Sequence, residues 1–411
     1  MFAALPNTIR LVLAAFLWTK GPADNATPSP SPIRFQLRHE HAVLNGSRSV
    51  FSDVPSSSSF LDDYYTVPTT SLTTHRPPSA AAYADARALS MQRAQSPVLA
   101  WDSVRVAGPD ISKRETLLQL AKMTSNSYYG EPGHKSWYPL DGWNASIPFG
   151  WEPDADGFRG HVFVSDDNST VVLSIKGTSA PWLAGGEGPT KKKDKLNDNL
   201  LFSCCCARVG PTWYTVCDCF AGGDKCDQNC VENALIDDSL FYPIGTNLYN
   251  DVAYMYPDAN IWLTGHSLGG SLAALLGATF GAPVVAFETP GERMAAQRLH
   301  LPSPPSTHHI THVYHTGDPI PMGTCTGVAS SCALGGFALE SRCHLGQRVL
   351  YDTVTRRGWA VDARQHGILF IIEKLLNEHW DPEAGLEVPE VDLDEDCVDC
   401  YNWQYGDFKS K

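Results

Sequence analysis

A serine between two glycines is the part of the sequence with the clearest chemistry. Residues 265–269 read Gly-His-Ser-Leu-Gly, the Gly-x-Ser-x-Gly pattern of a nucleophile elbow. The apolar residues 260–264 are expected to form a short buried strand before it, and the small residues 271–279 a helix after it. A sharp strand-to-helix turn would expose the Ser267 hydroxyl at a sheet edge, and the flanking glycines would avoid side-chain clashes there. We therefore take Ser267 as the candidate nucleophile, whereas His266 is expected to pack beside the elbow.

A serine hydroxyl is a weak nucleophile, and it needs a general base that a carboxylate holds in place. In hydrolases built on α/β sheets, the order along the chain is serine, then carboxylate, then histidine. Asp318 lies in the sequence His-Thr-Gly-Asp-Pro-Ile-Pro, directly after the expected strand 309–314. Its position fits the carboxylate, and a turn aspartate before a proline is the alternative interpretation.

Three histidines follow Asp318 and could supply the base: His344, His366 and His379. His366 directly precedes the apolar helical pattern of residues 367–376, at a loop end from which a side chain can reach the sheet. We take His366 as the candidate base, with His344 and His379 as the alternatives.

The negative charge that forms on the attacked carbonyl oxygen needs hydrogen-bond donors. One candidate donor is the backbone N–H of Leu268, because it lies at the start of the expected helix. The second should come from the loop after an earlier strand. Residues 175–179 read Ile-Lys-Gly-Thr-Ser after the apolar strand 170–174, and Thr178 offers both a backbone N–H and a hydroxyl.

The elements that must position these residues alternate between strands and helices, which predicts an α/β fold with a mostly parallel central sheet. Two apolar runs around an Asp/Asn/Ser turn predict a hairpin before the main set. The expected strands are 160–165, 170–176, 260–264, 283–287 and 309–314, and the expected helices are 116–123, 240–255, 271–279, 293–298 and 367–376.

Composition divides the 411 residues, of which 43% are hydrophobic, into four ranges. We expect a signal peptide or signal-anchor at 1–23, a Ser/Thr/Pro-rich lumenal linker at 24–80, the catalytic domain at 81–380 and an acidic tail at 381–411. The linker has no apolar periodicity that would form a buried face, apart from a short strand expected at 35–43. A Cys-rich insertion at 179–240 interrupts the domain, and its apolar residues suggest a lid-like cover over the site.

Cysteine content and charge indicate the compartment and exclude some partners. Twelve cysteines together with N-glycosylation sequons predict the secretory pathway and disulfides, since paired Cys-x-x-Cys zinc knuckles are missing from the sequence. The sequons begin at Asn25, Asn45, Asn144 and Asn168. The net charge of −14 argues against a nucleic-acid partner, because phosphate neutralisation needs clustered Lys and Arg.

Several motifs together resemble the class-three lipases, the fungal triacylglycerol lipase superfamily. They are Lys-Gly-Thr at 176–178, Gly-His-Ser-Leu-Gly-Gly at 265–270 and Gly-Asp-Pro-Ile-Pro at 317–321. The run 193–206, which ends in Cys-Cys-Cys, and the run 397–403, Cys-Val-Asp-Cys-Tyr-Asn-Trp, are more specific. They are similar to the fungal autophagic lipases, the phospholipases that lyse autophagic bodies in the vacuole.

The resemblance implies an α/β-hydrolase-like lipase fold and a serine-dependent hydrolysis of glycerolipid carboxylic esters. Ser267 would attack, His366 would accept its proton, Asp318 would orient His366, and Leu268 and Thr178 would hold the oxyanion. It implies no metal and no cofactor. Membrane phospholipids would be the substrate, and the protein would be membrane-associated.

The resemblance also implies a type II single-pass anchor, N-glycosylation, and traffic through the endosome and multivesicular body to the vacuole lumen. The alternatives are a secreted, soluble triacylglycerol lipase or esterase, and a catalytically dead lipid-binding module.

Overall fold

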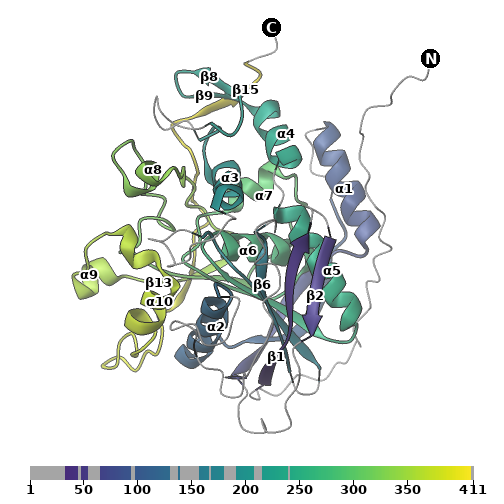
Figure 1. The fold of residues 1–411 in the computed structure, drawn as a ribbon, viewed down its shortest axis with the longest axis vertical. Coiled ribbons are helices and arrows are strands. Elements are labelled where there is room, and N and C mark those ends of the chain that lie inside the picture. Colours follow the sequence, from purple (N-terminus) through teal and green to yellow (C-terminus); the bar gives the residue numbers. More distant parts are fainter. Residues whose placement is uncertain are drawn as a thin grey trace.

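A single large sheet organises the protein, which we describe from a computed structural model (Figure 1). The structure describes residues 33–44, 48–53, 65–93, 98–129, 138, 157–165, 168–179, 191–207, 215–238 and 241–408. The strand order is β14-β13-β12-β11-β10-β7-β6-β1-β2, and β3 also pairs with β1. Its strands are β1 (Ile33–Leu44), β2 (Arg48–Asp53), β3 (Tyr65–Val67), β6 (Arg159–Ser165), β7 (Thr170–Ile175), β10 (Asn260–His266), β11 (Val284–Phe287), β12 (Ile310–His315), β13 (Gln347–Tyr351) and β14 (Val391–Leu393).

The centre of this sheet is parallel, from β7 through β10, β11 and β12 to β13. Antiparallel strands extend it on both sides: β6 forms the expected hairpin with β7, and β14 pairs with β13. The expected α/β fold with a mostly parallel central sheet is therefore confirmed.

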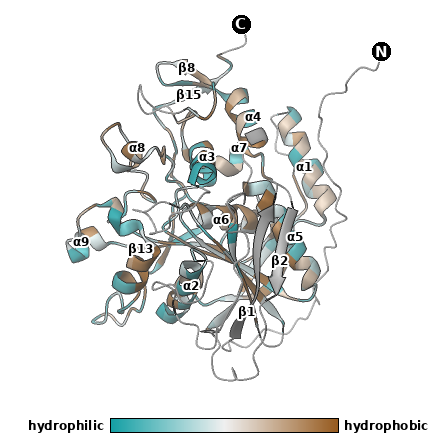
Figure 2. Cartoon of the chain, in the orientation of Figure 1, coloured by the Kyte–Doolittle hydropathy of each residue, from teal (hydrophilic) through white to brown (hydrophobic). Residues whose placement is uncertain are grey.

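Helices cover both faces of the parallel strands. Successive strand residues point to opposite faces, so Ile261 and Leu263 pack into one apolar cluster and Trp262 into the other. The first face is covered by α5 (Phe241–Met255) and α6 (Leu268–Phe280), the second by α2 (Arg114–Asn126), α10 (Ile368–Phe370) and the π-helix η2 (Ile371–Leu375). In Figure 2 the segment of α10 and η2 is largely hydrophobic, as its position against the sheet requires.

The range 24–80, which we expected to be a linker, contributes strands, and the expectation is wrong for these parts. β1 pairs with β6, β2 pairs with β1, and β4 (Thr69–Arg76) pairs with β5 (Asp102–Pro109). The expected short strand 35–43 lies within β1. Backbone hydrogen bonds to the open edge of β6 need no apolar periodicity, so the polar composition did not reveal them. Residues 1–23 lie outside the described residues; within the part that is described, no helix has the length and apolarity to cross a membrane.

All twelve cysteines form disulfides, as expected. The Cys-rich insertion contains α3 (Lys191–Phe202), β8 (Phe220–Gly222), β9 (Lys225–Asp227) and α4 (Gln228–Asp238). Its internal bridges are Cys205–Cys226, Cys206–Cys217 and Cys219–Cys230. Zinc ligation by these cysteines is therefore excluded in this structure.

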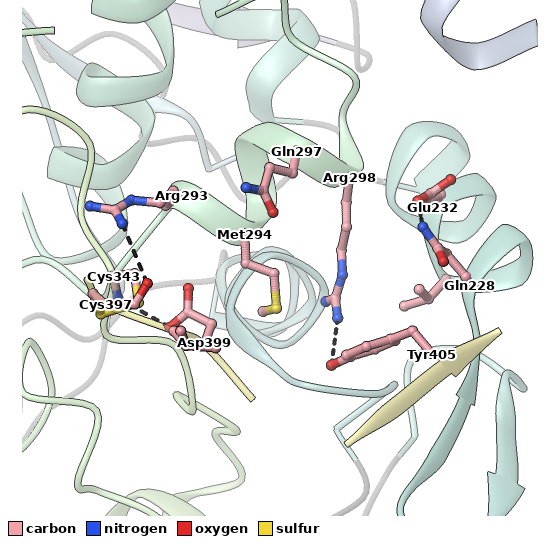
Figure 3. Close-up of a pocket in the computed structure, with 12 residues that line it drawn as sticks. Gln228, Glu232, Arg293, Met294, Gln297, Arg298, Cys343, Cys397, Asp399 and Tyr405 are labelled. Carbon is pink, nitrogen blue, oxygen red and sulfur yellow. Dashed lines mark hydrogen bonds between the residues drawn. A yellow bond between two sulfur atoms is a disulfide. The ribbon is translucent and has the colours of Figure 1, made fainter. Parts of the chain in front are cut away.

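The acidic tail packs against the domain and is joined to it by strand pairing and disulfides. Its strand β15 (Gln404–Gly406) pairs with β9 of the insertion, and β14 extends the main sheet. The bridges Cys204–Cys400 and Cys343–Cys397 fix it covalently. In Figure 3, Arg298 of α7 (Arg293–Arg298) donates to the Tyr405 hydroxyl at 3.1 Å. The remaining helices are α1 (Ala80–Arg93), α8 (Ser331–Gly335), α9 (Thr353–Arg357) and η1 (Ala363–His366).

Candidate active site

Ser267 occupies the sharp turn between β10 and α6. Its backbone has φ 56° and ψ −131°, a conformation that L-residues rarely adopt. Two flanking glycines make the turn possible. A Cβ at Gly269 would lie 2.3 Å from the Ile175 carbonyl oxygen, and one at Gly265 would lie 2.5 Å from the backbone of Gly269. The surrounding sheet stabilises this strained backbone conformation, because the Ser267 N–H donates to the Phe287 carbonyl at 3.0 Å.

Asp318 and His366 meet at one edge of the sheet. Asp318 follows the end of β12, and His366 is the last residue of η1. The His366 Nδ1 lies 2.5 Å from Asp318 Oδ2, and both side chains are fully buried. Because a carboxylate only accepts, Nδ1–H donates and the other ring nitrogen of the neutral imidazole is bare. That atom, Nε2, is buried and has no hydrogen-bond partner among the described residues.

The charge of Asp318 is set by opposing effects. Burial alone would raise the pKa of its carboxyl, but the charge of His366 and the hydrogen bond from it outweigh burial and hold the pKa below its usual value. The Ile320 N–H also donates to Asp318 Oδ1 at 3.0 Å. The carboxylate is therefore kept ionised and in a fixed orientation toward His366.

His266 packs beside the elbow and connects Ser267 with the candidate base. Its Nε2 donates to the His366 carbonyl oxygen at 2.7 Å, so its Nδ1 accepts from the Tyr128 hydroxyl at 2.6 Å. Burial, followed by the charge of His366, lowers the pKa of His266 to about 3, which keeps this ring neutral. The hydrogen bonds of His266 join the end of β10 to η1 and to the segment that follows α2, and no sequence pattern indicated them.

The loop with Thr178 lies against the elbow. A Cβ at Gly177 would be 3.2 Å from the Ser267 Cβ, and 2.3 Å from the His266 carbonyl oxygen. Only glycine leaves room for this approach. Leu268 is the first residue of α6, so its N–H has no partner within the helix. The Thr178 hydroxyl donates to Asp198 Oδ2 at 2.7 Å, which leaves its backbone N–H as the second candidate oxyanion donor.

Two buried carboxyls of α3 support this loop, and sequence analysis missed both. Asp198 accepts from Thr178, and burial raises its pKa to about 8. Asp194 accepts from the Ser179 N–H at 2.8 Å and lies 3.6 Å from the Lys176 Nζ. The signal was a four-residue spacing that places both aspartates on one face of a helix.

Glu288 is another buried carboxyl that sequence analysis missed, and it lies near Asp318. It follows β11 with φ 44°, and its Oε2 accepts from the His315 N–H at 3.4 Å. Burial, and then the charge of Asp318, raises the pKa of Glu288 well above its usual value. Glu288 therefore favours its neutral form, whereas Asp318 favours its ionised form.

The alternative bases lie elsewhere. His344 donates from Nε2 to the Thr289 carbonyl oxygen at 2.8 Å and packs against His312, while His379 is exposed. Of the sequons, Asn168 is described and exposed; Asn25, Asn45 and Asn144 lie outside the described residues. Asn168 therefore has the exposure that a glycan needs.

Comparison with known proteins identifies the family to which this chain is similar. Residues 223–326 match the family described as Lipase (class 3), a range with Ser267 and Asp318 but without His366. Among solved structures, Lip2 lipase from Yarrowia lipolytica is 18% identical and covers 59% of this chain and 80% of its own, with a TM-score of 0.31.

Relatives at higher identity cover most of the chain. Lipase ATG15 from Cryptococcus neoformans var. neoformans (strain B-3501A) is 49% identical over 368 residues, 75% of this chain and 70% of the relative. Lipase ATG15 from Mycosarcoma maydis is 43% identical over 370 residues, 76% of this chain and 70% of the relative. The chain therefore belongs to the ATG15 family of class 3 lipases.

Proposed function

We propose that this protein hydrolyses carboxylic ester bonds of phospholipids and triacylglycerols by a serine-dependent mechanism that releases fatty acid. The observation that carries the proposal is the buried His366, whose Nδ1 donates to Asp318 at 2.5 Å while its Nε2 has no partner among the described residues. The strained turn at Ser267 adds a nucleophile next to His266, which is hydrogen-bonded to the His366 carbonyl.

In the proposed acylation step, Ser267 Oγ attacks the acyl carbonyl carbon and His366 Nε2 accepts the serine proton. Asp318 stabilises the imidazolium that forms. The backbone N–H groups of Leu268 and Thr178 donate to the oxyanion. When the tetrahedral intermediate collapses, the ester C–O bond breaks, and His366 returns the proton to the leaving lysolipid or glyceride alcohol.

In the deacylation step, a water molecule gives a proton to His366 Nε2 and attacks the acyl carbon. The second tetrahedral intermediate collapses, the bond to Ser267 Oγ breaks, and the serine takes the proton back from His366. The net reaction consumes one water and releases one fatty acid, so it needs no external oxidant or reductant.

The cellular part of the proposal is lysis of membrane vesicles, including autophagic bodies, in the vacuole. Membership in the ATG15 family supports a role in autophagy. The disulfides support entry into the secretory pathway, because such bonds persist in oxidising compartments. We propose that a type II anchor within residues 1–23 carries the N-glycosylated protein through the endosome and multivesicular body to the vacuole lumen.

The experiment compares the full-length protein with its Ser267→Ala variant on two substrates, phosphatidylserine liposomes and short soluble esters, with a fluorophosphonate probe as a third readout. We expect the wild-type protein to release fatty acid from liposomes and to label at Ser267, and the variant to do neither. Hydrolysis of soluble esters alone would indicate an esterase instead. Liposome binding without hydrolysis or labelling would contradict the serine mechanism.

The cellular role has its own test. Cells that express only the Ser267→Ala variant should accumulate intact vesicles in the vacuole during starvation. Normal vesicle clearance in these cells, with the variant shown to reach the vacuole, would contradict the cellular role and leave the lipase activity standing.

A further inference from the structure

Behind the nucleophile elbow, three buried side chains from different elements meet. Glu292 directly precedes α7, His312 lies in β12, and His344 lies in the loop before β13. Glu292 and His312 are fully buried, and His344 is 4% exposed. One possible ligand atom from each residue lies within 4.8 Å of the other two. The proposed mechanism uses none of these residues.

Thr289 orients both imidazole rings. The His344 Nε2 lies 2.8 Å from the Thr289 carbonyl oxygen. Because a carbonyl only accepts, Nε2 carries the proton and Nδ1 of the neutral ring is bare. The His312 Nδ1 lies 2.8 Å from the Thr289 hydroxyl. A hydroxyl can accept this proton, and the His312 Nε2 is then bare as well.

Each of the three residues has one buried atom without a hydrogen-bond partner among the described residues: Glu292 Oε2, His312 Nε2 and His344 Nδ1. The His312 Nε2 lies 3.1 Å from Glu292 Oε1, a contact that a charged pair would make. That contact alone leaves Glu292 Oε2 and His344 Nδ1 unpaired. Buried polar atoms without partners are rare in folded proteins, so this cluster needs an additional explanation.

We propose that Glu292, His312 and His344 bind one divalent transition-metal ion of the zinc class. Two neutral imidazoles and one carboxylate are a ligand set that zinc favours. Metal-binding histidines commonly donate the other ring N–H to a carbonyl or another oxygen, which is the arrangement that Thr289 provides. The site differs from the sequence-based expectation that no metal is bound.

A cavity lies next to one of the three residues. His344 lines a cavity of about 500 Å³ together with Arg293 and Asp394. The Arg293 guanidinium donates to the His344 carbonyl oxygen at 2.8 Å, which fixes the backbone of this ligand. Figure 3 shows Arg293 close to Cys343, the residue before His344, on the neighbouring pocket.

Bound there, the ion would have a structural role. It would join the start of α7, β12 and the loop before β13 through side chains. Thr289 lies between these ligands and the elbow: a Cβ on Gly270 would be 2.3 Å from the Thr289 methyl group, and the Ser271 hydroxyl donates to the Pro290 carbonyl at 2.9 Å. The ion would therefore hold the segment against which the elbow packs.

The experiment measures metal on the full-length, disulfide-bonded protein without a polyhistidine tag. After dialysis against metal-free buffer and addition of zinc, we expect inductively coupled plasma mass spectrometry to find one zinc ion per chain. Cobalt(II) in place of zinc should give visible d–d absorption bands of a low-symmetry site. A wild-type protein that takes up neither metal would overturn the proposal, without bearing on the lipase activity.

Zinc content in single-residue variants tests which side chains bind the ion. His344→Gln and Glu292→Gln should lose it, and Thr289→Val, which keeps all three ligands, should weaken zinc affinity by roughly 10–100-fold. His309→Gln is the matched control, because His309 is also buried and bonds a backbone carbonyl through Nε2. It should keep the full zinc content. Full zinc content in a folded His344→Gln protein, or unchanged affinity in Thr289→Val, would contradict the site.

Discussion

The buried carboxyl groups of Asp318 and Glu288 lie close together but favour different protonation states. The charge of His366 and the hydrogen bond from it hold the pKa of Asp318 low despite burial, whereas burial raises the pKa of Glu288 well above its usual value. Two like charges this close would each disfavour the other, so the pair carries one proton. We therefore expect Glu288 to stay neutral beside an ionised Asp318.

Replacing Glu288 by Gln tests this assignment, because Gln has the shape of a neutral Glu. We expect kcat/KM of Glu288→Gln to fall by less than about tenfold, since one neutral hydrogen bond is worth about 0.5–1.5 kcal/mol. The acid limb of its pH–rate profile should stay in place. An acid limb displaced from that of the wild-type protein would show that Glu288 is ionised in the working enzyme.

Sequence patterns could identify those site residues that are marked by their immediate neighbours along the chain. Ser267 is marked by its glycines, and Asp318 and His366 by their order and their positions after a strand and before a helix. Glu288 carries no such mark, and the four-residue spacing of Asp194 and Asp198 indicates only that they share one face of a helix. Asp198 meets Thr178 only when α3 packs against the loop after β7, and Glu288 meets His315 only when β11 pairs with β12. No spacing along the chain encodes either contact.

At the scale of elements, α3 fixes the loop that carries Thr178, and the charge on Asp198 couples this contact to pH. Burial raises the pKa of Asp198 to about 8, against about 3.9 in an unfolded chain. A pKa that is raised on folding gives a contribution that is fully present below about pH 3.9 and is lost as pH rises through about 8. Stability contributed by this group therefore falls across that window.

Asp198→Asn should remove this pH dependence, because Asn does not titrate and its amide oxygen can still accept from Thr178. The stability of the variant relative to wild type should increase by up to about 1.4 kcal/mol per pH unit between about pH 4 and 8. Urea unfolding of both proteins at several pH values measures the difference. Parallel stability curves would mean that Asp198 is ionised in the folded protein.

The main strands and helices could be predicted because their apolar residues repeat with the period of the element. Of the strands within 24–80, only the part of β1 at 35–43 could be predicted. β2 could not, since it is specified by backbone pairing to β1 and not by an apolar pattern. The apolar run 367–376 was predicted as a helix, but it is divided into α10 and the π-helix η2. Periodicity does not distinguish these helix types over so few residues.

For the molecule as a whole, disulfides connect regions far apart in sequence. Cys204–Cys400 joins the insertion to the tail across 196 positions, whereas Cys325–Cys332 spans 7. The bridges attach the segment after α3 to the tail, and the tail to the loop before β13. Whether the insertion also acts as a lid over the site stays a prediction.

Paired Cys→Ala variants test the structural weight of the long bridge and leave no unpaired thiol. Loop-closure entropy predicts that removing Cys204–Cys400 costs about 2–3 kcal/mol more than removing the matched short bridge Cys325–Cys332. Guanidinium unfolding without reductant measures both losses. Equal losses would show that packing around the tail, and not the covalent link, holds it in place.

The most direct test of the central claim is the rate of fatty-acid release from phosphatidylserine liposomes by Ser267→Ala, His366→Ala and the double variant. If Ser267, His366 and Asp318 act as one unit, each single change should lower kcat by about 10⁶ and the double change by little more. Near wild-type activity in His366→Ala, or a double variant whose loss is the product of the single losses, would contradict the account.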